Sequence, residues 1–479
     1  MEKKDAYIII DIGTGNARVA LVTAEGKVIS IAREDIRYLR DLLYPDALYF
    51  EPAVLWDQIV RLTRTVLQQS SGLSVRAVTA TSQREGIVLM DGSGQGLIGL
   101  PNIDHRGREW EDLIKDKSSI YHLTGRRPSS LFSVLKLAGI RGRRSELWER
   151  LSFFLSISDW VEYQLSGVAK YEHSQASETL LYDVEQKSWS QELAAFFGIG
   201  ASYLPELVDA SSVLGKLLPA RAAELSLSAD VVVVAGGGDT QLAIKSICPS
   251  VDDIVLVSGT TTPVVKLVNR YVLDRQERTW TSRDIEADRY VFEANAGVTG
   301  LNYQRLKEVF YPNESYEVIE KELAENPHRT CVASLGSLIA GEKEPLVKGG
   351  FIFSAPVTQE LSRSCFVHAT LVDIACSIAE NYRVLCEVAG EEKDYVWACG
   401  GGMQSLSLRQ MIADVLGKEV RVRPGFQHAS VLGGALVCNE ALRQEASLPA
   451  AEEAVRPQRR DDVSALHEQW KKARDKFRH

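Results

Sequence analysis

The stretch YIIIDIGTGNARVALV, residues 7–22, decides the fold of this chain. An apolar strand runs into a turn of small and polar residues, and a second apolar strand follows the turn. The stretch DDIVLVSGTTTPVVKLV, residues 252–268, repeats this order of strand, Gly/Thr turn and strand. Such self-similarity is typical of a duplicated domain.

The sequence between and after these stretches alternates between strand and helix patterns. Residues 51–69 carry apolar side chains at helical spacing, and VRAVTATSQ (75–83) is typical of a strand. We expect residues 107–205 to be mostly helical and 367–390 to form a helix with a long apolar stripe. The alternation predicts an α/β fold.

The length of 479 residues is comfortable for two domains. We expect an N-terminal sugar-binding and catalytic domain at 1–246 and a C-terminal nucleotide-binding domain at 247–445. Residues 446–479 mix acidic and basic side chains, so we expect a charged, helical and solvated tail, not a nucleic-acid-binding arm.

Composition excludes several classes of function. The net charge of −9 and pI near 5.6 disfavour a nucleic-acid-binding protein. No apolar run is long enough to span a bilayer, and the N-terminus is too short in apolar residues for a signal peptide. We therefore expect no membrane partner. The seven cysteines are scattered without zinc-ligand spacing, which indicates reduced thiols in a cytoplasmic protein.

Four turns of small residues each follow an apolar strand, and they are the candidate functional elements. They are Asp11–Asn16, Gly236–Asp239, Ser258–Thr262 and Gly400–Gly402. Taken singly, each indicates only a tight turn. Together they favour phosphate binding, because glycine lets backbone N–H groups approach an anion and Thr or Ser adds donors.

Two common nucleotide-binding motifs are excluded by spacing. The dinucleotide fingerprint G-x-G-x-x-G leads into a helix, whereas Gly13-Thr-Gly15-Asn-Ala-Arg18 lacks the third glycine and leads into the strand VALV. The P-loop string G-x-x-x-x-G-K-[ST] does not occur. A dehydrogenase and a P-loop ATPase are therefore disfavoured.

The ordered set of motifs resembles the FGGY carbohydrate kinases, within the actin, hexokinase and heat-shock ATPase superfamily. DIGTGNAR resembles the first phosphate hairpin, GGGDTQ the catalytic loop and SGTTT the second phosphate hairpin. ACGGGMQSLSLRQMIADVLGKEVRV, followed by ASVLGGALV, resembles the adenosine-binding segment. The resemblance covers roughly residues 6–445 and implies two ribonuclease-H-like domains with a nucleotide cleft between them.

The resemblance implies that Asp239 is the catalytic base, which accepts the proton of the attacking hydroxyl. Thr240 beside it is an expected acceptor-binding residue, and the glycines before it are expected to leave room for a sugar. The alternative is that Asp239 merely caps the helix that follows. Asp11, through water, and Asp239 are expected to hold Mg²⁺.

The resemblance also implies which residues bind ATP. The expected contacts to the phosphates and to adenosine are Gly13, Thr14, Gly15, Asn16, Ser258, Gly259, Thr260, Thr261, Gly400, Gly401, Gly402, Gln404 and Ser405. Arg18 either adds positive charge near the phosphates or is a surface arginine on a strand.

For the acceptor, the informative string is TSQREGIVLMD (81–91). In the glycerol kinase branch an Arg-Glu pair at this place holds polyol hydroxyls, which carries over to Arg84 and Glu85. The alternative is an Arg–Glu ion pair that only braces the domain.

Two departures from the family pattern bear on the acceptor. Leu131 stands where the glycerol pocket has a tyrosine, and Asn102 stands in place of Trp in N-I-D-H-R. The Asn form together with R-E-G-I-V-L resembles the autoinducer-2 kinases, which phosphorylate a linear dihydroxylated pentanedione; xylulokinase-like pentulose kinases remain the competing interpretation. Asp104 and Arg106 either shape the pocket or form a structural salt bridge.

The expected activity is ATP-dependent transfer of a phosphoryl group to a hydroxyl of a small sugar, polyol or related compound. A homodimer is compatible with this interpretation. The rival from another class is a catalytically inactive sugar- or nucleotide-binding regulator on the same scaffold, which the fold alone does not exclude.

Overall fold

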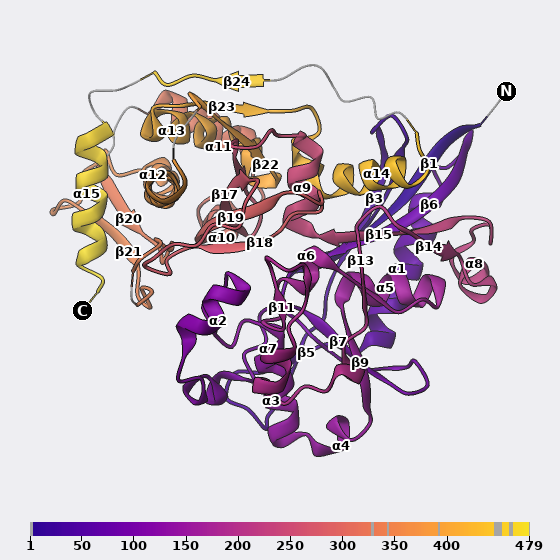
Figure 1. Cartoon of the computed structure of the whole chain (residues 1–479). Coiled ribbons are helices and arrows are strands. Elements are labelled where there is room, and N and C mark those ends of the chain that lie inside the picture. The colour runs from indigo at the N-terminus through magenta and orange to yellow at the C-terminus, as the bar shows by residue number, and fades with distance from the viewer. Residues whose placement is uncertain are drawn as a thin grey trace.

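Two β-sheets organise the computed structural model, which describes residues 3–326, 330–342, 344–390, 393–444, 453–458 and 463–478. The first sheet belongs to the N-terminal half and the second to the C-terminal half, and the sheets lie side by side (Figure 1). Strands and helices alternate along the chain, so the expected α/β class is confirmed.

The first sheet has the strand order β14-β15-β6-β1-β2-β3. Its strands are β1 (Lys4–Ile12), β2 (Asn16–Thr23), β3 (Val28–Asp35), β6 (Leu73–Ser82), β14 (Val213–Lys216) and β15 (Val232–Gly238). The second sheet has the order β18-β19-β17-β16-β22-β23-β24. Its strands are β16 (Ile254–Val257), β17 (Thr261–Val268), β18 (Trp280–Arg283), β19 (Tyr290–Val298), β22 (Tyr395–Cys399), β23 (Glu419–Val422) and β24 (Glu453–Val455).

The two sheets share one topology over their central strands. In the first, β3, β2 and β1 are antiparallel neighbours, and β6 and β15 continue the sheet in parallel with β1. In the second, β19, β17 and β16 are antiparallel, and β22 and β23 continue in parallel with β16. The duplication predicted from the two hairpin sequences is therefore confirmed.

Helices cover the sheets and connect the parallel strands. The helices of the N-terminal half are α1 (Pro52–Leu67), α2 (Lys117–Thr124), α3 (Ser133–Arg143), α4 (Ser145–Trp148), α5 (Ile157–Ser166), α6 (His173–Ala176), α7 (Gln191–Phe197), α8 (Pro219–Leu225) and α9 (Asp239–Ile247). Those of the C-terminal half are α10 (Gly300–Phe310), α11 (Tyr316–Glu325), α12 (Arg363–Ala389), α13 (Leu406–Leu416), α14 (Ala429–Ala441) and α15 (Val463–Asp475).

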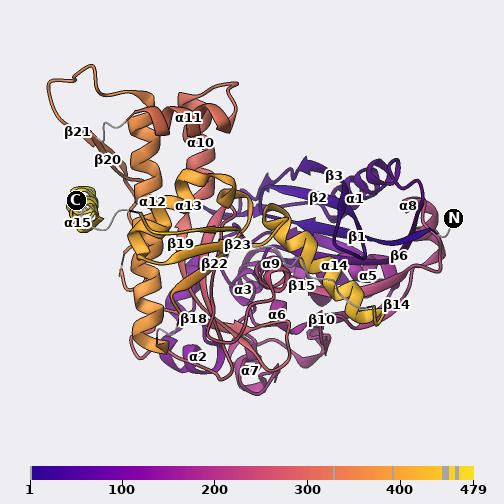
Figure 2. The ribbon, with the colours of Figure 1, turned by 90° about the horizontal axis from the view of Figure 1, so that it is seen from above.

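Shorter strands build a lobe under the first sheet and an extension of the second half. The lobe contains β7 (Ile87–Asp91), β8 (Gly96–Leu100) and β9 (Leu151–Ser156), with α2, α3, α4 and α7 around them (Figure 1). The extension carries β20 (Cys331–Ser334) and β21 (Gly350–Phe353) beside α10, α11 and α12 (Figure 2). The remaining short strands are β4 (Leu39–Arg40), β5 (Leu48–Tyr49), β10 (Lys170–Glu172), β11 (Tyr182–Asp183), β12 (Ser188–Trp189) and β13 (Glu206–Val208).

The expectation that residues 107–205 are mostly helical is wrong at β9. The segment LSFFLS pairs antiparallel with β7, with Phe154 opposite Leu89. Its aromatic and aliphatic residues suit a strand once a partner edge is present, and that partner lies about sixty residues earlier in the sequence, where local periodicity gives no sign of it.

The helix α14 crosses from the C-terminal half to the first sheet. Val431 and Ala435 of α14 share a core cluster with Tyr7 of β1 and Leu242 of α9. The last helix before residue 445 therefore buries its apolar face on the N-terminal half. The expected domain division at residue 246 stays a prediction.

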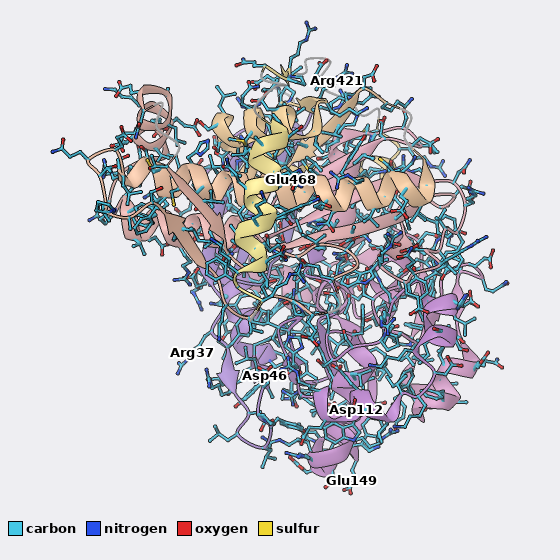
Figure 3. All side chains as sticks on the ribbon, turned by 90° about the vertical axis from the view of Figure 1, so that its left-hand side faces the viewer. Arg37, Asp46, Asp112, Glu149, Arg421 and Glu468 are labelled. Atoms are coloured by element: carbon cyan, nitrogen blue, oxygen red, sulfur yellow. The ribbon has the colours of Figure 1, made fainter. Side chains whose placement is uncertain are left out.

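The expectation of a solvated C-terminal tail is wrong for α15. Trp470 is fully buried against α12, and its indole Nε1 donates to Asp373 Oδ1 at 2.7 Å. Figure 3 shows α15 lying across α12, with Glu468 on its outer face. The sequence of α15 is rich in charged residues, but a few apolar side chains on one face are enough to pack a short helix against its neighbour. Residues 446–452, 459–462 and 479 of the tail lie outside the described residues.

The cysteines are all free thiols. Within the described ranges, none of the helices combines the length and the apolar character needed to cross a bilayer.

Candidate active site

The predicted functional residues of the N-terminal half follow three neighbouring parallel strands. Ile12 at the end of β1 lies opposite Ser82 at the end of β6, and Ser82 also lies opposite Gly238 at the end of β15. The carboxyl ends of the three strands therefore meet at one edge of the sheet. In open α/β sheets ligands bind at such edges.

The loop before Asp239 is fixed by side chains from other segments. Glu162 Oε1 accepts a hydrogen bond from the Gly236 N–H at 2.8 Å, and Thr81 Oγ1 donates to the Gly237 carbonyl at 2.8 Å. Ser174 Oγ accepts from the Gly238 N–H at 3.0 Å and donates to Glu172. The backbone that presents Asp239 is therefore held at three consecutive residues.

The glycines of this loop serve packing, which corrects the expectation that they leave room for a sugar. A β-carbon at Gly236 would lie 1.9 Å from the carbonyl oxygen of Ala80, so the loop packs directly on β6. At Gly238 a β-carbon would lie 2.5 Å from Gln241 and 3.5 Å from Arg84. Space next to the catalytic loop is therefore already filled by protein at residues 236 and 238.

Asp239 is the first residue of α9 and keeps part of its side chain exposed. Its Oδ1 accepts hydrogen bonds from the Thr240 N–H at 2.6 Å and from the Thr240 hydroxyl at 3.3 Å. Burial raises the pKa of Asp239 to about 6, although Arg84 lowers it, and Asp11 adds to the rise. The carboxylate thus both stabilises the start of α9 and lies in the electrostatic field of Asp11 and Arg84.

Asp11 and Arg18 form an ion pair across the β1–β2 hairpin, where they are directly opposite each other. The Ser430 hydroxyl at the start of α14 also donates to Asp11 Oδ2, at 2.6 Å, and Arg18 donates to Ser430 at 2.9 Å. The alternative that Arg18 is only a surface arginine is therefore disfavoured. Asp11 brings negative charge and Arg18 positive charge to the end of the first sheet.

The turn between β1 and β2 contains Gly13, Thr14 and Gly15, and Asn16 begins β2. Among the described residues, no atom outside the turn lies within 4 Å of a β-carbon built at Gly15, so this side of the turn is open to a ligand. Thr14 is held by two other residues of the N-terminal half. The Tyr38 hydroxyl donates to the Thr14 carbonyl at 2.8 Å, and the Asn102 side chain contacts the Thr14 hydroxyl at 3.0 Å.

The second predicted turn, Ser258 to Thr261, follows β16. Val257 lies opposite Cys399 in parallel strands, so Ser258 and Gly400 are neighbours at the carboxyl end of the second sheet. The Ser258 N–H donates to the Cys399 carbonyl at 2.8 Å, and the Ser258 carbonyl accepts from the Gly402 N–H at 3.1 Å. The two predicted loops of the C-terminal half therefore form one unit.

The two turns, 258–261 and 400–402, contain both buried and exposed residues. Ser258 is buried, whereas Gly259 and Thr260 are exposed and Thr261 is partly exposed. A β-carbon at Gly402 would lie 2.2 Å from Ser258 Oγ, so this glycine is needed for packing. Thr260 and Thr261 are accessible to a ligand, whereas the Gly259 N–H already donates to the Thr261 carbonyl at 2.9 Å, and Ser258 with Gly400 and Gly402 supports the turn.

Gln404 and Ser405 differ in their surroundings. The Gln404 side chain is exposed and its Nε2 donates to the Gly401 carbonyl at 3.2 Å. Ser405 is the N-cap of α13, accepting from the Leu408 N–H at 3.1 Å, and its hydroxyl donates to Glu320 at 2.6 Å. The Ser405 hydroxyl is therefore engaged within the protein, while Gln404 is available to a base edge.

These turns have the composition of anion-binding turns. The open backbone at Gly15 and the exposed residue Thr260 are suited to meet an anion, one at each sheet. Mg²⁺ accepts few carboxylates and keeps several waters. Asp11 Oδ1, to which none of the described residues donates, and Asp239 Oδ2 would supply those carboxylate oxygens.

The predicted acceptor residues Arg84 and Glu85 follow β6 and are both buried. Arg84 does not pair with Glu85; its guanidinium binds Glu293 of β19 in two hydrogen bonds, of 2.6 and 3.0 Å. None of the described residues donates to the Glu85 carboxyl group. Burial and the nearby Glu178 raise the pKa of Glu85 to about 8.

Asp104 and Arg106 form the structural salt bridge that was one of the two expectations. Arg106 Nε donates to Asp104 Oδ2 at 2.8 Å, and Arg106 also pairs with Asp41. All three side chains are fully buried. They brace the lobe below the first sheet.

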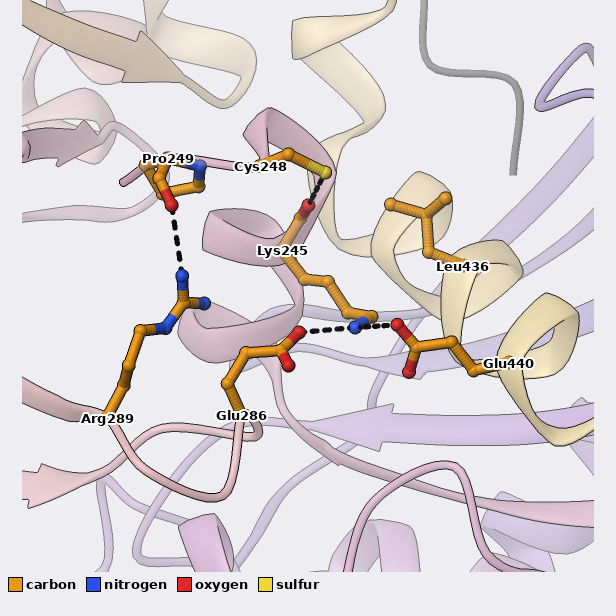
Figure 4. Close-up of a pocket in the computed structure, with 7 residues that line it drawn as sticks. All are labelled: Lys245, Cys248, Pro249, Glu286, Arg289, Leu436 and Glu440. Carbon is orange, nitrogen blue, oxygen red and sulfur yellow. Dashed lines mark hydrogen bonds and ion pairs between the residues drawn. The ribbon is translucent and has the colours of Figure 1, made fainter. Parts of the chain in front are cut away.

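Away from the catalytic loop, α9 meets the C-terminal half at a small cavity of about 180 Å³. Its lining residues are Lys245, Cys248, Pro249, Glu286, Arg289, Leu436 and Glu440. Figure 4 shows Lys245 lying between Glu286, which it binds at 2.6 Å, and Glu440 of α14. Lys245 thus ties α9 to both neighbouring segments and contacts no predicted site residue by an ion pair.

Sequence reasoning missed the residues that support the site from distant segments. They are Thr81, Glu162, Glu172, Ser174, Glu293 and Ser430. Glu293 carried a signal, because a single acid interrupts the apolar strand YVFEANAGV. The others are ordinary polar residues whose partners become apparent only when the strands are assembled.

The family whose models match the chain is described as the FGGY family of carbohydrate kinases. Its N-terminal domain matches residues 6–245 and its C-terminal domain matches residues 307–442. A Bacillus subtilis protein named "Putative sugar kinase YoaC" is 48% identical over 480 residues, covering 100% of this chain and 98% of that protein.

More distant relatives have different named substrates. The xylulose kinase of Staphylococcus epidermidis is 25% identical and covers 92% of this chain and 88% of its own. The autoinducer-2 kinase of Salmonella paratyphi B is 23% identical and covers 92% and 86%.

Solved structures show the same fold. Gluconate kinase from Lactobacillus acidophilus aligns with a TM-score of 0.84 at 16% identity, covering 99% of this chain and 98% of the other. Glycerol kinase from Plasmodium falciparum, solved with ADP, aligns with a TM-score of 0.85 at 18% identity and covers 99% of both chains. The expected two-domain fold of the actin and hexokinase type is confirmed.

Proposed function

The chain belongs to the FGGY family of carbohydrate kinases, and from that membership we propose that it transfers the γ-phosphoryl group of ATP to a hydroxyl of a small sugar, polyol or related carbonyl compound. The observation that carries the proposal is the meeting of Asp239, Arg84 and Asp11 at the adjoining carboxyl ends of β15, β6 and β1. A base, an acceptor-binding cation and a carboxylate for Mg²⁺ are thereby supplied from one sheet edge.

Asp239 acts as the general base. Its pKa of about 6 leaves it ionised at neutral pH, so it can accept the proton of the attacking hydroxyl. A weak base suffices because phosphoryl transfer passes through a loose transition state, where positioning and charge neutralisation dominate. The three hydrogen bonds to residues 236–238 hold the carboxylate in place for this task.

The nucleotide is ATP with Mg²⁺. When bound, the ion neutralises charge on the transferred phosphoryl group. The turns at residues 13–16 and 258–261 bind the phosphates through backbone N–H groups and threonine hydroxyls. Asp11 is oriented for the ion by Arg18 and Ser430, and the loop at residues 400–404 supports adenosine.

Within this class, the specific acceptor that we propose is a short, linear hydroxy ketone bound through a vicinal diol. Arg84 supplies donors and Glu85 supplies an acceptor, which together satisfy two neighbouring hydroxyls. A pentulose and a dihydroxypentanedione share this chemistry. Asn102, the departure that favours the dione, contacts Thr14 of the phosphate turn in this fold, so it does not itself select between them.

An ADP-release assay on the purified protein with ATP and Mg²⁺ tests the proposal. The acceptor panel holds pentuloses, polyols, aldonates and dihydroxypentanedione. We expect ADP release to depend on a five-carbon hydroxy ketone. Fast ATP hydrolysis that no acceptor changes would contradict the proposal, and a signal from aldonates alone would contradict the acceptor class.

A further inference from the structure

An ion pair between the two halves lies in the acceptor region. Arg84 comes from the end of β6 in the first sheet, and Glu293 comes from β19 in the second. Their two hydrogen bonds join both guanidinium terminal nitrogens to both carboxylate oxygens, at 2.6 and 3.0 Å. The Glu293 side chain is fully buried and that of Arg84 is 8% exposed.

Buried charges of this kind are costly unless they are paired. Burial raises the pKa of Glu293, but the charge and hydrogen bonds of Arg84, the Arg126 charge and the Asn295 hydrogen bond together outweigh burial, and the pKa is lowered. Asn295 donates a further hydrogen bond to Glu293 Oε1 at 3.2 Å. Glu293 is therefore an ionised carboxylate whose bidentate geometry fixes the plane of the Arg84 guanidinium.

The pair lies beside the catalytic loop. A β-carbon at Gly238, the residue before Asp239, would be 3.5 Å from Arg84 Cγ. The Arg84 charge also lowers the pKa of Asp239 against the effect of burial. One side chain, Arg84, thus separates the carboxylate of the second half from the proposed base.

The ribbon that carries Glu293 also covers the acceptor lobe. Trp280, directly opposite Glu293 on β18, packs on Phe132 with ring centroids 5.8 Å apart and lies under Arg126 at 4.8 Å. Arg126 Nε and Nη1 are buried and have no hydrogen-bond partner among the described residues. Two N–H groups of Arg126 are therefore not used by the described residues at the place where the two halves meet.

We propose that Glu293 is a positioning residue for phosphoryl transfer: it orients Arg84 for the acceptor, and because it belongs to the other half, the acceptor site is complete only when the halves are together. This inference rests on the proposed function. It assigns to the nucleotide-binding half a direct part in acceptor recognition. Acceptor binding and approach of the halves then favour each other, since both require the same ion pair.

The test compares Glu293→Gln with a matched variant at the same seam. Glu277→Gln removes another ion pair between the halves, Arg127–Glu277 at 2.6 Å, in which Arg127 is 56% exposed. We expect Glu293→Gln to raise the acceptor KM by at least ~10-fold, as expected when one partner of a buried charge pair is lost. The rate of ATP hydrolysis without acceptor should be the same in Glu293→Gln as in the wild type, so the stimulation of ATP turnover by acceptor should be smaller in the variant. Glu277→Gln should keep the acceptor KM within about twofold: Glu277 is 13% exposed and also accepts from Ser118, but its cationic partner Arg127 lies largely in solvent, where charge pairs contribute little.

A double-mutant cycle separates positioning from a structural role. If Glu293 acts through Arg84, adding Glu293→Gln to Arg84→Gln changes the acceptor KM no further. The double variant removes both charges of the Arg84–Glu293 pair, so its acceptor KM can be measured even if Glu293→Gln alone fails to fold. Glu293→Asp keeps the carboxylate and should recover part of the acceptor affinity. Three results would overturn the inference: additive effects of the two substitutions on the acceptor KM, an unchanged acceptor KM in Glu293→Gln, or an equal rise of the acceptor KM in Glu277→Gln. If the wild-type protein still transfers phosphate to an acceptor, the proposed kinase activity stands in each of these cases. A wild type that phosphorylates no acceptor would overturn both.

Discussion

Asp11 and Arg18 face each other across the β1–β2 hairpin and form an ion pair, and Ser430 of the C-terminal half donates to the same carboxylate oxygen. The Asp11 carboxylate raises the pKa of the Arg18 guanidinium, so Arg18 keeps its positive charge beside the turn. This places one oriented carboxylate at the start of the first phosphate turn, and none of the described residues donates to its second oxygen, Oδ1.

The first prediction concerns Mg²⁺. Asp11→Asn should lower the apparent affinity for Mg²⁺ on the order of 10–100-fold, the usual effect of losing an outer-sphere partner. Titration of the rate with Mg²⁺ at saturating nucleotide measures it. Ser430→Ala removes only one hydrogen bond to the same carboxylate and should shift the titration less. An Asn variant with the wild-type Mg²⁺ dependence would show that Asp11 does not serve the ion.

The second prediction concerns the base. Asp239→Asn should lower kcat on the order of 10²–10⁴-fold, the range for loss of a general base, while acceptor binding persists. Turnover and calorimetric acceptor binding are measured on the same preparation. Asp230→Asn breaks an exposed pair with Lys216 and should leave both quantities unchanged. Near-wild-type turnover in the Asp239 variant would remove it from this role.

The third prediction is a pH profile. Because the base must be ionised and its pKa is raised to about 6, kcat/KM should be flat above that pH and fall tenfold per unit below it. Arg84 lowers this pKa and Asp11 raises it. The inflection should therefore move to higher pH in Arg84→Met and to lower pH in Asp11→Asn. Shifts in the opposite directions would contradict the interpretation that the fall of kcat/KM at low pH reflects protonation of Asp239.

The fourth prediction tests the support of the catalytic loop. Ser174→Ala leaves the Gly238 N–H without its acceptor, which should cost about 1–3 kcal/mol of unfolding free energy. A displaced Asp239 should also lower kcat, by up to ~10²-fold. Ser190→Ala removes the N-cap of α7 and should cost about 1 kcal/mol without touching kcat. Ser174→Thr keeps the hydroxyl and should keep most activity; equal kcat in the two alanine variants would contradict the loop's dependence on Ser174.

The two hairpins and the duplicated topology could be predicted because each depends on local sequence. A run of β-branched residues, a Gly/Thr turn and a second apolar run define a hairpin without reference to the rest of the chain. The candidate residues that end strands, such as Asp11 and Asp239, follow for the same reason. The parallel order of β1, β6 and β15 then brings them to one edge.

What could not be predicted depends on partners far apart in sequence. β9 becomes a strand through pairing with β7, and Arg84 finds Glu293 more than two hundred residues away, not its neighbour Glu85. The glycines at 236 and 402 looked like room for a ligand, but they accommodate the backbone of β6 and the side chain of Ser258. Close packing between segments is invisible to periodicity.

The last prediction concerns α15, whose charged sequence concealed a buried anchor. Trp470→Ala should lower the free energy of unfolding by about 3–5 kcal/mol, the usual cost of removing a buried aromatic side chain. Trp470→Phe keeps most of the apolar contact but removes the donor to Asp373 Oδ1, so it should cost about 1–3 kcal/mol. Urea denaturation followed by circular dichroism measures both. Glu468→Ala on the exposed face of the same helix should change stability by less than about 0.5 kcal/mol. Because α15 packs on α12 and not on the strands that end at Asp239, kcat should stay unchanged in all three variants; a Trp470→Ala protein as stable as Glu468→Ala would mean that the helix does not dock.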